Sequence, residues 1–215
     1  MRASKHLKNY LKSFYGFGKW KSDFYFVGLE FGGVKSENLN LRIDEWSKMG
    51  RKSLVNFDTY HNNIGQQNTY QRTYDTLCSS FLRKKFDHDV KACFIDISPL
   101  PLKMQSGRIR HTEFLEIIHK RSKFIANQIM RNKPKFVILY GLDKDYFSQL
   151  ECLLNFFDAK KVPVGKTYFK WKQVDQHTII IQVTHHSHRH QYSTEFTQKD
   201  IYKTIRRKLL YRKLL

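Results

Sequence analysis

Short runs of β-branched and aromatic residues alternate along this chain with segments whose apolar residues recur at helical spacing. The expected strands cover residues 24–29, 93–97, 135–140, 168–174 and 178–183, and the expected helices cover residues 38–48, 69–85, 111–131, 144–157 and the segment from 197 onward. A polar connector is expected up to about residue 68. Strands separated by helices form a parallel sheet with helices on both faces. The alternation therefore predicts a three-layer α/β/α sandwich with a central, mainly parallel sheet.

The length and cysteine content predict one domain without a disulfide framework. A chain of 215 residues with 40% hydrophobic content can bury one substantial core, so we expect a single domain over residues 1–215. The three cysteines, Cys78, Cys93 and Cys152, form no CxxC pair, so the sequence indicates neither a disulfide framework nor a zinc knuckle. We expect all three to be small core residues.

The charge balance indicates a polyanionic partner. Lysine and arginine number 39 against 19 aspartate and glutamate residues, which gives a formal charge of +20. Such an excess predicts attraction to nucleic acid, with DNA as the leading partner. No apolar segment approaches the roughly 20 residues that span a bilayer, and the basic N-terminal segment lacks the continuous apolar core of a signal peptide. We therefore expect a cytoplasmic, nucleoid-associated protein with no membrane partner and no evident obligate protein partner.

Three polar loops begin at the ends of three expected strands. They are residues 28–33 (GLEFGG), 96–101 (DISPLP) and 184–191 (THHSHRHQ), the last with four histidines and an arginine. In open α/β sheets, ligands bind beyond the carboxyl ends of the strands. Because parallel strands share that edge, the three loops are expected to converge there and to form a site.

In this order, the loops resemble the three active-site motifs of the uracil-DNA glycosylase superfamily, most closely those of its single-strand-selective monofunctional branch. GLEFG at 28–32 corresponds to Gly-Met-Asn-Pro-Gly, and DISPL at 96–100, followed by Ser106-Gly107-Arg108, corresponds to Asn-x-Cys-Pro-Leu and Ser-Gly-Arg. HHSHRH at 185–190 corresponds to His-Pro-Ser-Pro-Arg-Asn, with His186 and His188 in place of both prolines. The resemblance spans the chain and implies a monofunctional DNA glycosylase without cofactor, which cleaves the N-glycosidic bond of a flipped pyrimidine and leaves an abasic site.

The resemblance assigns catalytic roles to two residues. N-glycosidic hydrolysis needs a donor that stabilises the departing base anion and a carboxylate near the oxocarbenium-like sugar. His185 matches the histidine that donates to the base O2. Glu30 occupies a position where some branches hold a water-orienting Asp and others an Asn, and a carboxylate there favours water activation. The alternative for Glu30 is a solvated loop residue.

Asp96 departs from the family's motif at a position that recognises the base. It stands where the family has an Asn whose amide recognises uracil. An ionised Asp only accepts hydrogen bonds, so it suits the N4 amino group of cytosine and faces the uracil O4 unfavourably. Two alternatives remain open: an Asp96 protonated through burial still donates to uracil, and Asp96 braces the following loop without contacting a base.

Gly32, like an ionised Asp96, favours a base other than uracil. In uracil-specific branches this position holds a bulky aromatic that blocks 5-substituted pyrimidines, whereas glycine leaves room for a larger substituent. Together, Asp96 and Gly32 predict a modified cytosine, hydroxymethylated or glucosylated as in some phage DNA, and hence a role in phage defence. The alternative is a repair glycosylase that excises uracil or thymine.

The remaining candidates are contacts to the base and to DNA. The resemblance makes Arg189 the residue that wedges into the duplex and Ser187 a phosphate contact, and Arg108 lies in the segment expected to contact DNA. The alternatives are that Arg189 is a surface residue that contacts phosphate and that Ser187 is a turn hydroxyl. Gly28 and Phe31 flank the base, where Phe31 or Phe57 can stack on it.

Two other functional classes compete with the glycosylase. His185, His186, His188 and His190, together with His88 and Asp89, have the chemistry of divalent-metal ligands and would make a metal-dependent nuclease. Alternatively, the basic segments 5–21 and 205–213 can track phosphates in a non-catalytic DNA-binding domain.

Overall fold

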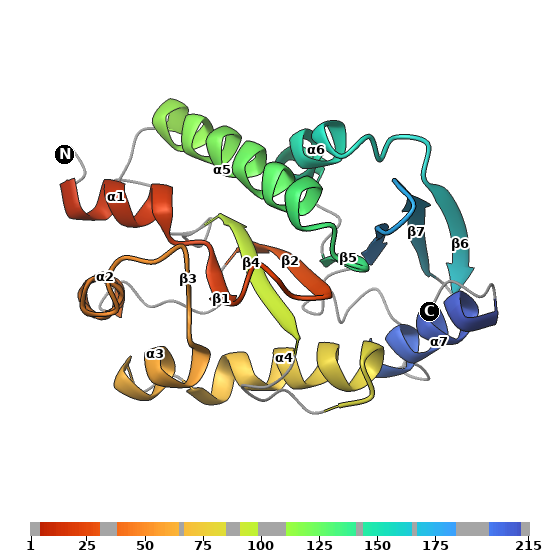
Figure 1. The fold of residues 1–215 in the computed structure, drawn as a ribbon, viewed down its shortest axis with the longest axis horizontal. Helices are drawn as coiled ribbons and strands as arrows, with labels where there is room; N and C mark the ends of the chain where they lie inside the picture. The colour runs from red at the N-terminus through yellow and green to blue at the C-terminus, as the bar shows by residue number, and fades with distance from the viewer. Residues whose placement is uncertain are drawn as a thin grey trace.

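The structure is a computed structural model that describes residues 5–30, 38–64, 67–84, 91–98, 111–140, 144–164, 167–183 and 198–211. Within these residues, one mixed sheet has eight strands in the order β3-β1-β4-β2-β5-β8-β7-β6 (Figure 1). The strands are β1 (Gly16–Gly18), β2 (Phe24–Glu30), β3 (Leu54–Val55), β4 (Ala92–Ser98), β5 (Phe136–Tyr140), β6 (Lys160–Val164), β7 (Thr167–Gln173) and β8 (Ile179–Val183).

Most of the central pairings are parallel. Strands β4, β2, β5 and β8 run parallel to one another, and β1 is parallel to β3 but antiparallel to β4. At the other end, β8, β7 and β6 form an antiparallel meander. The predicted α/β fold with a mainly parallel sheet is confirmed, while its finer likeness to uracil-DNA glycosylases stays a prediction.

Helices lie on both sides of the sheet. In Figure 1, α5 and α6 lie above the strands, and α3, α4 and α7 lie below them. The helices are α1 (Lys5–Ser13), α2 (Asn38–Lys48), α3 (Phe57–Ile64), α4 (Gln67–Phe81), α5 (His111–Asn132), α6 (Lys144–Leu153) and α7 (Gln198–Tyr211). None of the helices in the described ranges is long and apolar enough to cross a membrane.

The central strands form because they are apolar on both sides, as expected of a sheet covered on both faces. Every residue of β4, β5 and β8 is buried. Aromatic rings fill the space between the sheet and α4: Phe26 stacks on Phe94 at 5.1 Å between centroids, and Tyr74 of α4 stacks on Phe94 at 3.8 Å. The core therefore fixes β2 and β4 side by side.

The segment predicted as a polar connector up to residue 68 contains β3, α3 and the start of α4. Leu54, Val55 and Tyr60 are buried there. Asn56 caps α3, since its Oδ1 accepts a hydrogen bond from the backbone N–H of Thr59 at 2.9 Å. The prediction was wrong because a two-residue strand shows no periodicity and the Asn-rich composition concealed a capped helix.

Two further expectations are corrected: the end of the helix predicted over 144–157 and the burial of Cys152. The helix predicted over 144–157 ends at Leu153, because Asn155 adopts a left-handed φ of 52° and the N–H of Phe156 bonds to the carbonyl of Glu151 at 2.8 Å, as in a Schellman motif. The basic segment 5–21 contains α1, which buries Leu7, Tyr10 and Leu11 in the core. Cys78 and Cys93 are buried as expected, but Cys152 is exposed.

Candidate functional site

The carboxyl-end edge of the sheet is the first candidate site. Gly28 of β2 pairs with Asp96 of β4 on one side and with Tyr140 of β5 on the other, and Tyr140 pairs with Val183 of β8. These residues form a row across four parallel strands near their carboxyl ends. The strands that lead into the three polar loops therefore end at the same edge, as expected.

Most of the predicted site residues lie beyond these strand ends. Glu30 is the last residue of β2 and its backbone pairs with Ser98, but its side chain lies outside the described residues. Also outside are the other predicted catalytic, base-binding and DNA-binding residues and the metal-ligand candidates: Phe31, Gly32, His88, Asp89, Arg108, His185, His186, Ser187, His188, Arg189 and His190. Of the predicted site, the structure describes Gly28 and Asp96 in full. Phe57 is buried in the core, where its ring packs edge-on against that of Tyr74 at 5.2 Å.

Gly28 is required by its neighbour Tyr140. A Cβ built on Gly28 would lie 2.6 Å from Cε2 of Tyr140 and still closer to Cζ and Oη. Any side chain at this position would therefore displace the buried tyrosine ring. Tyr140 was not predicted as a site residue, although the sequence places it at the end of the 135–140 run. The phenol of Tyr140 lies over Gly28 of β2, the residue whose backbone pairs with Asp96.

Asp96 is buried, with 3% of its surface exposed. Its backbone N–H donates to the carbonyl of Tyr15 at 3.0 Å, and its own carbonyl accepts from Nη2 of Arg121 at 2.6 Å. The negative charge of Asp96 also favours the charged form of the Arg121 side chain. The interpretation of Asp96 as a bracing residue thus gains a definite partner.

Arg121 of α5 joins three elements beneath this edge. Its fully buried guanidinium donates to the carbonyls of Leu11 at 2.9 Å, Phe14 at 2.6 Å and Ile97 at 2.7 Å, in addition to that of Asp96. Burial lowers the pKa of Arg121 to about 10, although Tyr15, Asp96 and Tyr10 act in the opposite direction. The side chain therefore remains a cation at neutral pH.

The sequence offered a signal for Arg121 that was missed. The apolar residues Phe114, Ile117, Ile118 and Ile125 recur at helical spacing along the segment 111–131, and position 121 falls on the same face. A lone arginine on an apolar face predicts a buried cation that needs several acceptors. The pattern could not identify them, because all four are backbone carbonyls.

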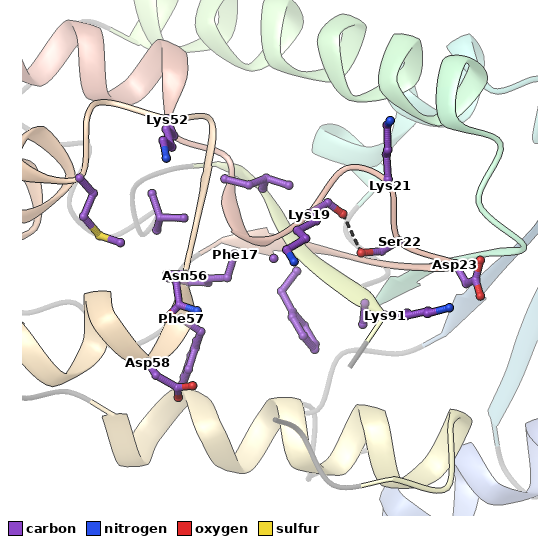
Figure 2. Close-up of a pocket in the computed structure, with 16 residues that line it drawn as sticks. Phe17, Lys19, Lys21, Ser22, Asp23, Lys52, Asn56, Phe57, Asp58 and Lys91 are labelled. Carbon is purple, nitrogen blue, oxygen red and sulfur yellow. Dashed lines mark hydrogen bonds between the residues drawn. The ribbon is translucent and has the colours of Figure 1, made fainter. Parts of the chain in front are cut away.

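A cavity of about 790 Å³ opens at the opposite, amino-end edge of the sheet (Figure 2). It lies between β1, the turn before β2, the start of β4 and the start of α3. Four lysines line it: Lys19, Lys21, Lys52 and Lys91. In Figure 2 the amino group of Lys19 points among the other lining residues, whereas Lys21 points away toward α5. This cavity was not predicted.

The lysines of this cavity are unpaired within the part of the chain that the structure describes. Asp23 at its rim instead pairs with Lys135, at 3.5 Å between Oδ2 and Nζ. Asp58 also lines the cavity, so four lysines face two aspartates and the cavity presents a net positive charge that attracts anions. Within the described ranges, no three His, Cys, Asp or Glu side chains gather as a metal site.

The sequence matches no protein-family model and no curated protein. The loop motifs and the geometry of the described residues therefore carry the functional argument.

Proposed function

We propose that the chain is a monofunctional DNA glycosylase that releases a pyrimidine from DNA and leaves an abasic site. The observation that carries this proposal is the parallel order β4-β2-β5-β8. It brings to one edge the strand ends that lead into GLEFG, DISPL and HHSHRH. Sites in open α/β sheets lie at such an edge, and the net charge of +20 supports a nucleic-acid substrate.

In the proposed reaction, the target nucleotide leaves the base stack and enters this edge. Glu30 orients a water molecule and accepts its proton as the water attacks C1′ of the sugar. The bond between C1′ and the base nitrogen breaks, and its electron pair leaves with the base. His185 donates a hydrogen bond to the O2 atom of the base, where negative charge accumulates. The base anion then takes up a proton, which balances the one accepted by Glu30, so the products are a neutral free base and an abasic sugar, with no metal or cofactor involved.

Asp96 supports a cytosine-type base in this scheme. A negative charge at Asp96 favours the charged form of Arg121, and the proposal takes Asp96 as an ionised carboxylate that only accepts hydrogen bonds. Such a carboxylate accepts from the N4 amino group of cytosine. Gly32 leaves room at the 5-position, so the proposed substrate is a 5-modified cytosine and the proposed role is phage defence.

The experiment compares oligonucleotides that carry uracil, cytosine, hydroxymethylcytosine or glucosylated hydroxymethylcytosine, each single- and double-stranded. Released bases are identified by mass spectrometry, and abasic sites are cleaved with alkali. We expect release of the modified cytosine, with undiminished activity in excess chelator. Activity on uracil alone would overturn the modified-cytosine assignment and leave a repair glycosylase. Strand cleavage without base release, abolished by chelator, would overturn the glycosylase in favour of a nuclease that uses the histidine cluster.

Variants separate catalysis from binding. Glu30→Gln and His185→Asn should each lower the rate of base release about 100-fold or more while retaining DNA affinity. Glu116→Gln and His177→Asn are matched controls, since both side chains are exposed and His177 precedes the amino end of β8, at the opposite edge of the sheet. Asp96→Asn should shift selectivity toward uracil. If the wild type binds every DNA tested but releases no base, the chain is a non-catalytic DNA-binding domain.

A further inference from the structure

A second basic pocket lies where the end of α4 meets α7. The two helices contact each other on one face of the sheet, where the end of α4 meets α7 (Figure 1). The pocket has a volume of about 290 Å³. Its polar lining consists of four cations and two hydroxyls: Arg83, Lys203, Arg206, Arg207, Ser79 and Ser80. None of the described residues that line it carries a carboxylate.

Two guanidinium groups of this pocket, those of Arg83 and Arg206, lie close enough to affect each other. Nε of Arg206 donates to the carbonyl of Phe81 at 3.0 Å, which fixes the side chain at the end of α4. Burial and the positive charge of Arg83 both lower the pKa of Arg206. Like charges held at close range repel one another. An anion between them would remove this repulsion.

A buried hydroxyl supplies an independent observation. Ser80 has 1% of its surface exposed, and its Oγ makes no hydrogen bond among the described residues. A buried polar group without a partner costs about 1 to 3 kcal/mol. The neighbouring Ser79 is satisfied, since its Oγ donates to the carbonyl of Thr76 at 3.3 Å. Ser80 therefore offers a donor to whatever occupies the pocket.

We propose that the α4–α7 pocket is a phosphate-binding site. Arginine forks match the oxygens of a phosphate group, and a serine hydroxyl adds a further donor. The group comes either from a nucleic-acid backbone or from free phosphate. The end of α4 leads through residues 85–90 to the amino end of β4, whereas the proposed base-release site lies at the carboxyl ends of the strands. The site is therefore additional to the glycosylase site and does not depend on that activity.

The test titrates the full chain with inorganic phosphate by calorimetry, against chloride at equal ionic strength. We expect saturable phosphate binding that Arg83→Gln and Arg207→Gln each weaken about tenfold, the loss of roughly one charge-assisted hydrogen bond. Arg131→Gln is the matched control, because Arg131 is exposed at the end of α5 and remote from the pocket. Equal losses in Arg131→Gln and Arg83→Gln, or no difference between phosphate and chloride, would overturn the proposal.

Ser80→Ala tests the site without removing charge. The free protein should melt at the same temperature or slightly higher, because an unpaired buried hydroxyl is removed. Its phosphate affinity should fall about fivefold, with a smaller rise in melting temperature on adding phosphate. Full phosphate affinity in this variant would exclude Ser80 as a ligand and overturn the site as described.

A second arm identifies the source of the phosphate. Binding of a fluorescein-labelled single-stranded oligothymidine is measured by anisotropy in Arg83→Gln and in the control Arg131→Gln. A backbone site predicts weaker oligonucleotide binding in Arg83→Gln than in Arg131→Gln. A site for free phosphate predicts equal oligonucleotide affinity in the two variants, with phosphate binding weakened in Arg83→Gln but not in Arg131→Gln.

Discussion

At the carboxyl-end edge of the sheet, Arg121 is fully buried and donates to four backbone carbonyls, with the charge of Asp96 in support. At the amino-end edge, Lys19, Lys52 and Lys91 line a cavity and form no ion pair within the described ranges. Both edges carry positive charge. They differ in whether the protein itself supplies the acceptors.

This difference separates charge that builds the fold from charge that is available to a ligand. Removing a cation from water costs several kcal/mol, so a buried arginine persists only where its donors are satisfied. Exposed lysines remain hydrated and need no partner. Arg121 therefore holds α1, β4 and α5 in place beneath the proposed catalytic edge, whereas the cavity lysines should contribute little to stability.

The largest expected effect comes from Arg121→Met. The variant leaves four buried carbonyls without a donor, and we expect it to lower the free energy of unfolding by about 3 to 5 kcal/mol. Urea unfolding followed by circular dichroism measures the loss. Arg131→Met on the same helix is the control and should change stability by less than about 0.5 kcal/mol, because Arg131 is exposed. Equal stability of the two variants would show that the carboxyl-end edge does not depend on its buried charge.

Gly28→Ala tests the packing of the same edge. The added methyl group meets the ring of Tyr140, and overpacking of this kind costs about 2 to 3 kcal/mol. In a Tyr140→Val background the same substitution should cost less than about 0.5 kcal/mol, because the ring is absent. A double-mutant cycle by urea unfolding measures this coupling. Additive effects would mean that the ring of Tyr140 is not the source of the cost.

Much of the sheet could be predicted from the sequence because its central strands carry a simple signal. The apolar runs at 24–29, 93–97 and 178–183 are long enough to indicate buried strands, and they correspond to β2, β4 and β8. By contrast, β3 and α3 stand in a polar segment, where two residues and one capped turn decide the structure. Short elements depend on tertiary contacts that no local pattern records.

The site was predictable only in part, for a related reason. Parallel pairing follows from alternating strands and helices, so the common edge of the three strand ends was expected. Arg121 is different, since Leu11 is 110 residues away in the sequence and contributes only its backbone carbonyl. The lysine-lined cavity likewise combines residues from separate elements. Contacts to the backbone and shared cavities leave no motif in the sequence.

Asp96→Asn asks how far the buried cation depends on a counter-charge. The substitution keeps the shape of the side chain and removes the negative charge that favours the Arg121 cation. We expect a loss of about 1 to 2 kcal/mol in urea unfolding, since the four carbonyl acceptors of Arg121 remain. Asp44→Asn, at an exposed position of α2, is the control. Unchanged stability would assign Asp96 a role in substrate recognition rather than in bracing the fold.

Asp175, before the amino end of β8, is an exposed carboxylate that contrasts with the buried Asp96. Its Oδ1 accepts from the backbone N–H groups of His177 at 2.6 Å and Thr178 at 2.8 Å. Burial alone would raise the pKa of Asp175, but these hydrogen bonds and the charges of Lys133 and His177 outweigh it and lower the pKa. Its stabilisation is therefore present above the unfolded pKa and is lost as the pH falls through the lower folded value.

Asp175→Ala should accordingly cost about 1 kcal/mol at pH 7, the net value of a hydrogen-bonded turn at an exposed position. The gap to the wild type should narrow below about pH 3.9, the ordinary pKa of an aspartate. Urea unfolding at pH 7 and pH 3 measures both values, with Asp44→Ala as the exposed control. A gap that widens in acid would contradict the assigned sign.

The smallest expected effect on stability belongs to the combined variant Lys19→Gln, Lys52→Gln and Lys91→Gln. Because these side chains have no ion-pair partner in the described part of the chain, the free energy of unfolding should change by less than about 0.5 kcal/mol. Urea unfolding is compared directly with Arg121→Met, which removes one positive charge instead of three. A loss above about 1 kcal/mol in the lysine variant would mean that the fold needs these charges, and the contrast between the two edges would fail. Unchanged stability leaves the lysines available for binding, because a charge that the fold does not need can be matched by an anion without cost to the native state.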